Sequence, residues 1–263
     1  MTGFSGQDTP LAEIRREIDE IDDGLIELLE RRFAATEQVR IAKSSAATAL
    51  PIRPAREAEI LRRLVKRAEG QLSSDLVLRI WRAILSASTL AQAPLTIHVS
   101  RRLNSSVGLR LRIRDHFGPA AVEECKDEGQ ALLQVNAAPG DLCIVEPDSP
   151  WVEPFLEGQG GRAQVIGVLP VLRDEESPKL LIFGNARAEA TGDDQTLIIT
   201  DGQLPRDFAP KPAWQIKSGN RRVSCLPGFL SEHESPLVGL GRSNASLGIK
   251  VVGNFPSPIG ARS

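Results

Sequence analysis

Apolar residues recur every three or four positions between Leu11 and Ala42, and this spacing constrains the fold more than any other feature of the chain. Such a pattern is typical of a long helix that packs against other helices. We expect the helix to run from about Pro10 to Lys43 or Ser45, which makes it about 50 Å long at about 1.5 Å per residue. Because that length exceeds a compact domain of this size, we expect its apolar face to pack against a second subunit.

One position in this apolar series is occupied by an arginine. The series runs Leu11, Ile14, Ile18, Ile21, Leu25, Leu28, Arg32, Ala35, Val39 and Ala42. A guanidinium that loses its water is costly unless it meets an anion. The series contains no acidic residue, so either a partner helix supplies a carboxylate or Arg32 lines a pocket for an anionic ligand.

Two shorter helices are expected to follow the first. The second helix opens at Pro54, which suits the first helical position, and Gly70 ends it. The third begins after a cap at Ser73 or Ser74 and continues to about Gln92.

Polar side chains interrupt the inward faces of all three expected helices. Lys43 follows Arg32 by eleven residues, so the two cations lie about 20° apart around the helix and about 16 Å apart along it. Glu57 lies in the first turn of the second helix, and Ser88 and Gln92 continue an apolar row of the third. Two cations, a carboxylate, a hydroxyl and an amide suit a small dianion that carries a hydroxyl group, and they include no nucleophile–base pair.

Arg15 lies too far from Arg32 to share a pocket with it in one chain. The separation of 17 residues corresponds to about 25 Å along the helix and about 100° around it. In a dimer of antiparallel long helices, Arg15 would reach the pocket of the partner chain.

Five short motifs with this order and spacing resemble the all-helical chorismate mutases that form intertwined dimers. They read LAEIRxxIDxID at 11–22, LLERR at 28–32, VRIAK at 39–43, PxRPARE at 51–57 and SxSTLAQ at 86–92. The resemblance implies a homodimer with shared active sites and chorismate as the substrate. At one position the chain departs from the family, since Arg53 and Pro54 stand where many members have an aspartate.

The resemblance also implies a role for each candidate residue. Arg32 and the partner's Arg15 would bind the two carboxylates of the substrate, and Ser88 would line the carboxylate end. Lys43 and Gln92 would donate to the ether oxygen, with Lys43 also reaching a carboxylate. Glu57 would accept a hydrogen bond from the ring hydroxyl, and Arg56 would support the site.

The implied reaction is the unimolecular rearrangement of chorismate to prephenate in aromatic amino acid biosynthesis. It needs orientation of the substrate and a donor to the breaking ether bond, but no metal or cofactor. Three alternatives remain open at this point: an isochorismate pyruvate lyase, a bifunctional chorismate mutase–prephenate dehydratase, and a non-catalytic sensor of small acids.

The composition of the chain changes near Ala93–Pro94, where Gly, Pro and short β-type runs become frequent. We therefore predict an all-helical domain at residues 8–93 and an α/β domain at residues 94–263, the fold class α + α/β. The expected strands are 95–99, 120–124, 142–145, 164–169, 180–183 and 196–200, with helices at 105–117 and 126–134. Further β-type runs lie at 222–225 and 249–256, with a short segment at 237–240 between them.

The order of these parts resembles the bifunctional chorismate mutase–prephenate dehydratases. GDLCIVEPDS at 140–149 is similar to a dehydratase strand and loop, and IKVVGNFP near the end is similar to the closing strand of the small sensing domain, here about 207–263. The dehydratase motif GPxGT is missing after Leu95–Val99, and Gln195-Thr196-Leu197 stands in place of its TRF motif. We therefore expect a degenerate dehydratase-like region without dehydratase activity, in which Thr196 is an ordinary strand residue.

Composition excludes several other classes of protein. The net charge of −2 over 263 residues argues against broad nucleic-acid binding. No apolar run reaches the about 18 residues of a membrane span. Cys125, Cys143 and Cys225 lack metal-ligand spacing and are expected to be buried thiols in a reducing cytoplasm, and the three histidines share no close spacing.

Overall fold

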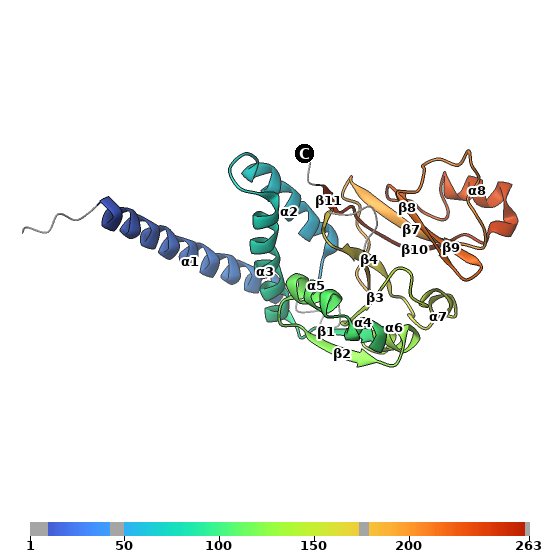
Figure 1. The fold of residues 1–263 in the computed structure, drawn as a ribbon, viewed down its shortest axis with the longest axis horizontal. Coiled ribbons are helices and arrows are strands. Elements are labelled where there is room, and N and C mark those ends of the chain that lie inside the picture. The colour runs from blue at the N-terminus through green and yellow to red at the C-terminus, as the bar shows by residue number, and fades with distance from the viewer. Residues whose placement is uncertain (1–9, 43–49, 174–178, 261–263) are drawn as a thin grey trace, which may run out of the picture. The chain divides into compact units, whose positions relative to one another are not determined.

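The computed structural model describes residues 10–42, 50–173 and 179–260 (Figure 1). The chain divides into two compact units, Met1–Ala47 and Thr48–Ser263. The first unit contributes one described helix, and all other described elements belong to the second.

Helix α1 (Pro10–Ala42) is the long helix that the apolar spacing predicts. It begins at the expected Pro10, whereas Lys43 and Ser45, the two expected ends, lie outside the described residues. Its apolar series is exposed, with Leu11, Ile14, Ile18, Ile21, Leu25 and Leu28 each between 50 and 57% accessible. An apolar stripe of this length on one helix is typical of a protein–protein interface.

Helices α2 (Pro54–Ala68) and α3 (Ser74–Gln92) confirm the two shorter helices. Pro54 opens α2, and the hydroxyl of Ser73 caps α3 by accepting a hydrogen bond from the amide of Leu76 at 3.2 Å. The two helices pack together through Leu61, Leu78 and Leu85, in a cluster that also holds Ile259 from the end of the chain. The helical pair is therefore joined to the rest of its unit by apolar packing.

A five-stranded mixed sheet follows, with strand order β2-β1-β3-β6-β4. Its strands are β1 (Thr96–Ser100), β2 (Ala121–Cys125), β3 (Leu142–Val145), β4 (Gln164–Leu169) and β6 (Leu180–Gly184). Strand β1 is parallel to β2 and β3, whereas β6 is antiparallel to β3 and β4. This confirms the partly parallel α/β sheet that the alternation of elements predicts.

Helices cover both faces of this sheet. They are α4 (Arg101–Ser105), α5 (Val107–Phe117), α6 (Glu128–Ala137) and α7 (Val152–Leu156). Leu142 and Ile144 face the cluster that includes α4 and α5, while Cys143 and Val145 face the cluster that includes α6 and α7. The strand alternates between the two cores, as expected for a sheet buried on both faces.

The helix expected at 105–117 corresponds to α5, which begins two residues later, whereas the sequence did not predict the short helix α4 before it. The hydroxyl of Ser100 caps α4 through the amide of Leu103, and α4 ends at Ser105. Ser106 then adopts an extended conformation, with φ −85° and ψ 106°, before α5 starts. The serine run Ser105–Ser106 separates the helices because serine competes with helical hydrogen bonding.

A second, antiparallel sheet has the order β10-β7-β9-β8. It contains β7 (Asp194–Thr200), β8 (Trp214–Ser218), β9 (Arg221–Pro227) and β10 (Lys250–Pro256). The connection from β9 to β10 holds α8 (Leu237–Ser243) and the short helix η1 (Ala245–Leu247), and β5 (Leu172–Arg173) pairs with β11 (Ile259–Gly260). The sequence analysis expects a small sensing domain at about 207–263. Because β7 lies before residue 207, the second sheet includes a strand from outside this range.

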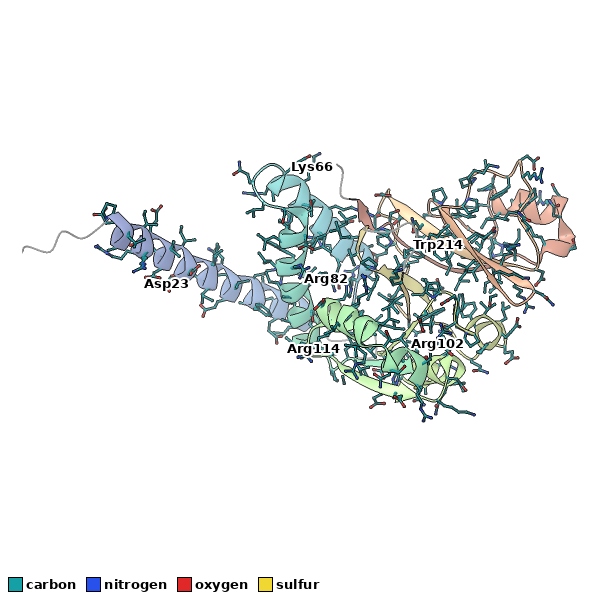
Figure 2. The ribbon with its side chains drawn as sticks, viewed as in Figure 1. Asp23, Lys66, Arg82, Arg102, Arg114 and Trp214 are labelled. Atoms are coloured by element: carbon teal, nitrogen blue, oxygen red, sulfur yellow. The ribbon has the colours of Figure 1, made fainter. Side chains whose placement is uncertain are left out.

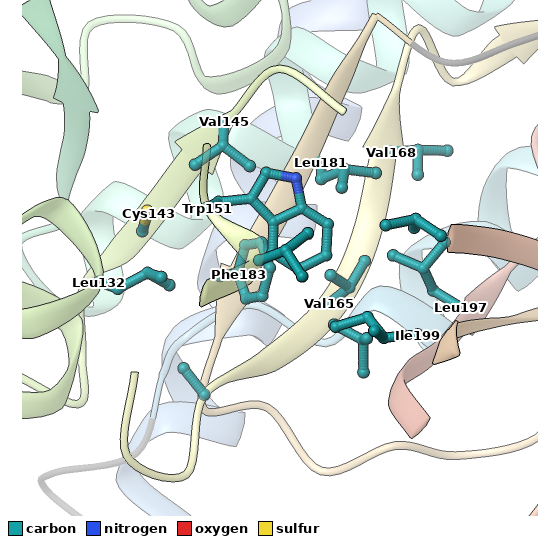
Figure 3. Packing of buried hydrophobic residues seen from close by; sticks show 14 of the residues in the cluster. Leu132, Cys143, Val145, Trp151, Val165, Val168, Leu181, Phe183, Leu197 and Ile199 are labelled. Atoms are coloured by element: carbon teal, nitrogen blue, oxygen red, sulfur yellow. The ribbon is translucent and has the colours of Figure 1, made fainter. Parts of the chain in front are cut away.

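The two sheets share one hydrophobic core. Trp151, Phe183 and Val165 pack beside Leu197 and Ile199 of the second sheet (Figure 3). The rings of Trp151 and Phe183 lie 5.3 Å apart in an edge-to-face arrangement. The second sheet is thus a continuation of the same folded unit. Among the described residues no helix is both long and apolar enough to cross a membrane.

Candidate functional site

The predicted site residues fall into the two units of the chain. Arg15 and Arg32 lie on α1, and Lys43 lies outside the described residues. Arg56, Glu57, Ser88 and Gln92 belong to α2 and α3 of the second unit. The two groups are therefore described separately.

The two arginines of α1 differ in their environment. Arg15 is exposed. Arg32 is partly buried, and burial lowers the pKa of its guanidinium from its usual value. The pKa of arginine is so high that the side chain still carries its charge near neutral pH.

The carboxylate of Glu57 forms an ion pair with Arg82, a residue that the sequence analysis did not select. The Nη1 atom of Arg82 lies 2.5 Å from Oε2 of Glu57, and the two side chains are only 10% and 15% exposed. The Nη2 atom of Arg82 donates to the main-chain oxygen of His116 at 3.2 Å. Arg82 therefore links the first turn of α2 to the last turn of α5. Figure 2 labels Arg82 among the side chains.

The surroundings of this ion pair are mostly apolar. It lines a cavity whose wall includes Leu61, Phe117 and Ile182, and His116 belongs to the same wall. Burial and the charge of Arg82 lower the pKa of His116 well below its usual 6.5. The ring is therefore neutral at pH 7, and the Arg82–Glu57 pair supplies the charges at this place.

Ser88 and Gln92 share one row of α3, as the four-residue spacing predicts. The buried hydroxyl of Ser88 donates to the main-chain oxygen of Ile84 at 2.8 Å, and the Nε2 atom of Gln92 donates to the main-chain oxygen of Ser88 at 3.0 Å. A primary amide has two donor hydrogens, so Gln92 can keep its hydrogen bond to the main-chain oxygen of Ser88 and still donate to a ligand.

Glu57 faces a different row of α3. The polar residues of α3 that line a small cavity with it are Arg82, Ser86 and Thr89. At about 100° per residue, Ser88 and Gln92 lie about 100° around the helix from Arg82. The structure thus brings Ser88 and Gln92 together and places Glu57 beside the neighbouring row.

The remaining predicted residue, Arg56, is exposed and pairs with Glu59 at 3.1 Å. Arg53, at the position where the chain departs from the family pattern, pairs with Glu189 at 3.1 Å. This second contact joins the segment before α2 to the α/β region, although both of its side chains are about half exposed. Exposed ion pairs of this kind contribute at most about 1 kcal/mol.

Thr196 is a buried strand residue in the second sheet. Its hydroxyl oxygen lies 2.6 Å from both the main-chain oxygen of Gly228 and Oδ1 of Asn254, and it accepts from the amide of Leu230 at 2.9 Å. The hydroxyl is therefore engaged in joining β7, β10 and the segment after β9. This arrangement favours the structural interpretation of Thr196.

Several other polar side chains of the α/β region contact one another in pairs. His98 contacts Asp141 at 2.9 Å, and Ser100 donates to the buried Glu128 at 2.9 Å. Within the ranges that the structure describes, no three His, Cys, Asp or Glu residues are grouped so that they could hold a metal ion. The three cysteines are buried free thiols, and burial raises the pKa of Cys143 well above its usual 9.0.

Residues 14–93 match the family model of chorismate mutase type II. The helical region at the start of the chain therefore matches a chorismate mutase domain, and a mixed α/β region follows it. The match covers every one of the predicted site residues.

Comparison with curated proteins gives no match. A solved structure described as "GqqA- a novel type of quorum quenching acylases" is similar, with a TM-score of 0.39 and 10% sequence identity. The similarity covers 62% of this chain and 95% of that chain.

Proposed function

We propose that the protein is a chorismate mutase, an isomerase that converts chorismate to prephenate. The observation that carries this proposal is the match of residues 14–93 to chorismate mutase type II, with Arg, Lys, Glu, Ser and Gln at the motif positions that would bind the substrate. The site residues are Arg15, Arg32, Lys43, Arg56, Glu57, Ser88 and Gln92. Chorismate carries two carboxylates, an ether oxygen and a ring hydroxyl, and this set contains a partner for each of them.

The chemistry of the reaction fits a site built from fixed cations and donors. Two arginines and Lys43 would hold the carboxylates, so that the flexible side arm lies over the ring and little orientational freedom remains to be lost. Lys43 and Gln92 would donate to the ether oxygen as negative charge grows on it. One well-placed donor to a developing negative charge is worth about 3 kcal/mol of transition-state stabilisation.

The proposed enzyme is a homodimer with two shared sites. The exposed apolar series of α1 supports this, because six large apolar residues along a 33-residue helix would be covered by a second copy of the same helix. In an antiparallel arrangement the partner's Arg15 completes the pocket that contains Arg32. The site is therefore incomplete in a single chain.

We further propose a boundary near residue 93, with the helical domain at 8–93 and a dehydratase-like region at 94–263. The interactions of Thr196 support a region without dehydratase activity, because its hydroxyl is occupied within the sheet. The buried free thiols support a cytoplasmic location, since a reducing compartment keeps cysteines unpaired.

A comparison of two substrates tests the function. The purified full chain is incubated with chorismate, and loss of its absorbance is followed together with the appearance of prephenate. A parallel reaction with isochorismate is assayed for pyruvate. Conversion of chorismate supports the mutase, whereas pyruvate from isochorismate alone identifies a lyase, and binding of either acid without turnover identifies a sensor.

A further inference from the structure

Arg82 occupies a position between the predicted substrate-binding carboxylate and the α/β region. One end of its guanidinium lies 2.5 Å from Oε2 of Glu57, and the other donates to the main-chain oxygen of His116 at 3.2 Å. The planar guanidinium offers donors in a fixed fork, so the two contacts are held at a fixed angle to each other. Movement of α5 relative to α3 would therefore change the position of the Glu57 carboxylate.

The last turn of α5 suits this contact. The carbonyl of His116 belongs to the final turn of an 11-residue helix, where main-chain oxygens have no partner within the helix and carry partial negative charge. The chain then turns at Gly118, whose φ is 61° and where a Cβ would lie 2.6 Å from Oγ of Ser86 on α3. The end of α5 thus packs closely against α3 at Ser86, which lies one helical turn after Arg82.

The contact with Arg82 uses only one of the two oxygens of Glu57. Among the residues that the structure describes, Oε1 of Glu57 has no hydrogen-bond donor. A carboxylate that is held by one oxygen can accept from a ligand with the other. Because both side chains are at least 85% buried, loss of either partner leaves an uncompensated charge in an apolar wall.

We propose that Arg82 is a positioning residue that holds Glu57 in the orientation needed to accept the ring hydroxyl of the substrate. Through the carbonyl of His116, the α/β region thereby sets the affinity of the mutase site. This inference rests on the proposed mutase function and on the assignment of Glu57 to the ring hydroxyl. It gives the region after residue 93 a role in the reaction of the helical domain.

A double-mutant cycle on the full chain tests the proposal. The variants are Arg82→Gln, Glu57→Gln and the pair combined, and kcat and KM for chorismate are measured for each. Arg79→Gln is the matched control, since Arg79 lies on the same helix, is exposed and pairs with Asp75 within that helix. We expect Arg82→Gln to raise KM about tenfold with a smaller change in kcat, in the range of couplings between residues in contact. Arg79→Gln should behave as the wild type.

The effect of Arg82→Gln should nearly vanish in the Glu57→Gln background, because Arg82 acts through that carboxylate. Arg82→Lys keeps the buried charge but not the fork, so it should raise KM by a smaller factor that also vanishes with Glu57→Gln. If Arg82→Gln does not fold, Arg82→Lys replaces it in the double-mutant cycle with Glu57→Gln. Thermal unfolding of each variant identifies those that have lost their structure.

Three results would overturn the proposal. An inactive wild type would overturn it together with the mutase function. An active wild type in which Arg82→Gln matches Arg79→Gln would overturn the role of Arg82 alone. Equal losses from Arg82 substitution with and without Glu57 would show that Arg82 acts on the fold and not through the carboxylate.

Discussion

Gly253 on β10 lies against the backbone of Val165 on β4, so closely that a Cβ at Gly253 would be 2.2 Å from the carbonyl oxygen of Val165. The obstacle is backbone in the interior of the unit, which cannot move aside as a flexible side chain can. Only a glycine fits between the two sheets at this point.

Gly253→Ala should therefore destabilise the protein by about 2–4 kcal/mol, as overpacking of a rigid site does. Urea unfolding of the purified chain measures the change. Gly140→Ala is the matched control, because a Cβ at Gly140 would meet nothing within 4 Å. We expect the control to change the free energy of unfolding by less than about 1 kcal/mol. Equal stability of the two variants would show that the sheets do not approach so closely.

His116 should make stability depend on pH. Burial and the neighbouring Arg82 lower its pKa in the folded state well below 6.5, whereas the unfolded chain takes up a proton near that value. The unfolded state then binds more protons below about pH 6.5, so this contribution is present above that pH and is lost as the pH falls. The slope is at most about 1.4 kcal/mol per pH unit.

His116→Gln should remove this part of the pH dependence. Chemical unfolding at about pH 7.5, 6.5 and 5.5 would show a smaller loss of stability in the variant than in the wild type over the lower interval. A variant whose stability falls as steeply as that of the wild type would contradict a neutral His116 with a lowered pKa.

The helical region is where sequence reasoning succeeds in most detail. Its ends are set by local signals, namely the prolines that open α1 and α2 and the Ser73 hydroxyl that caps α3. The sequence pattern did not indicate Arg82, although Arg82, like Arg32, is a cation that interrupts an apolar row of its helix. Its partners are Glu57, 25 residues earlier, and the carbonyl of His116, 34 residues later, and spacing along one helix predicts neither contact.

In the α/β region, strand positions follow from apolar runs but their pairing does not. Strand β7 precedes the expected tail yet pairs with β9 and β10, because antiparallel partners are chosen by long-range packing. The break at Ser106 between α4 and α5 has a local cause. It could not be predicted from the sequence, because serines occur inside helices as well. The substrate-binding roles of all seven candidate residues stay predictions.

Gln92 has a role that pH can test. A neutral amide donates to the ether oxygen at any ordinary pH, whereas a glutamate donates only when it is protonated. Gln92→Glu should therefore lose activity near about pH 7.5 and regain it as the pH falls toward about 5, following the titration of the new carboxyl group. The ratio of variant to wild-type kcat/KM across this range is the measurement. A constant ratio would remove Gln92 from the ether oxygen.

The α/β region should not release phenylpyruvate from prephenate. The dehydratase reaction needs a donor that helps the ring hydroxyl leave, and the hydroxyl of Thr196 is already held between Gly228 and Asn254. The full chain incubated with prephenate at neutral pH should give no phenylpyruvate above the uncatalysed rate. Enzyme-dependent phenylpyruvate that disappears in Thr196→Ala would instead make the protein bifunctional.

Complementation between two inactive variants tests the central claim, a mutase site shared between two chains. Arg15→Ala and Arg32→Ala should each abolish conversion of chorismate to prephenate, since every site then lacks one of its two carboxylate clamps. After subunit exchange, each mixed dimer has one site with both arginines and should recover about half the activity of a wild-type dimer. No recovery despite demonstrated exchange would contradict the shared site.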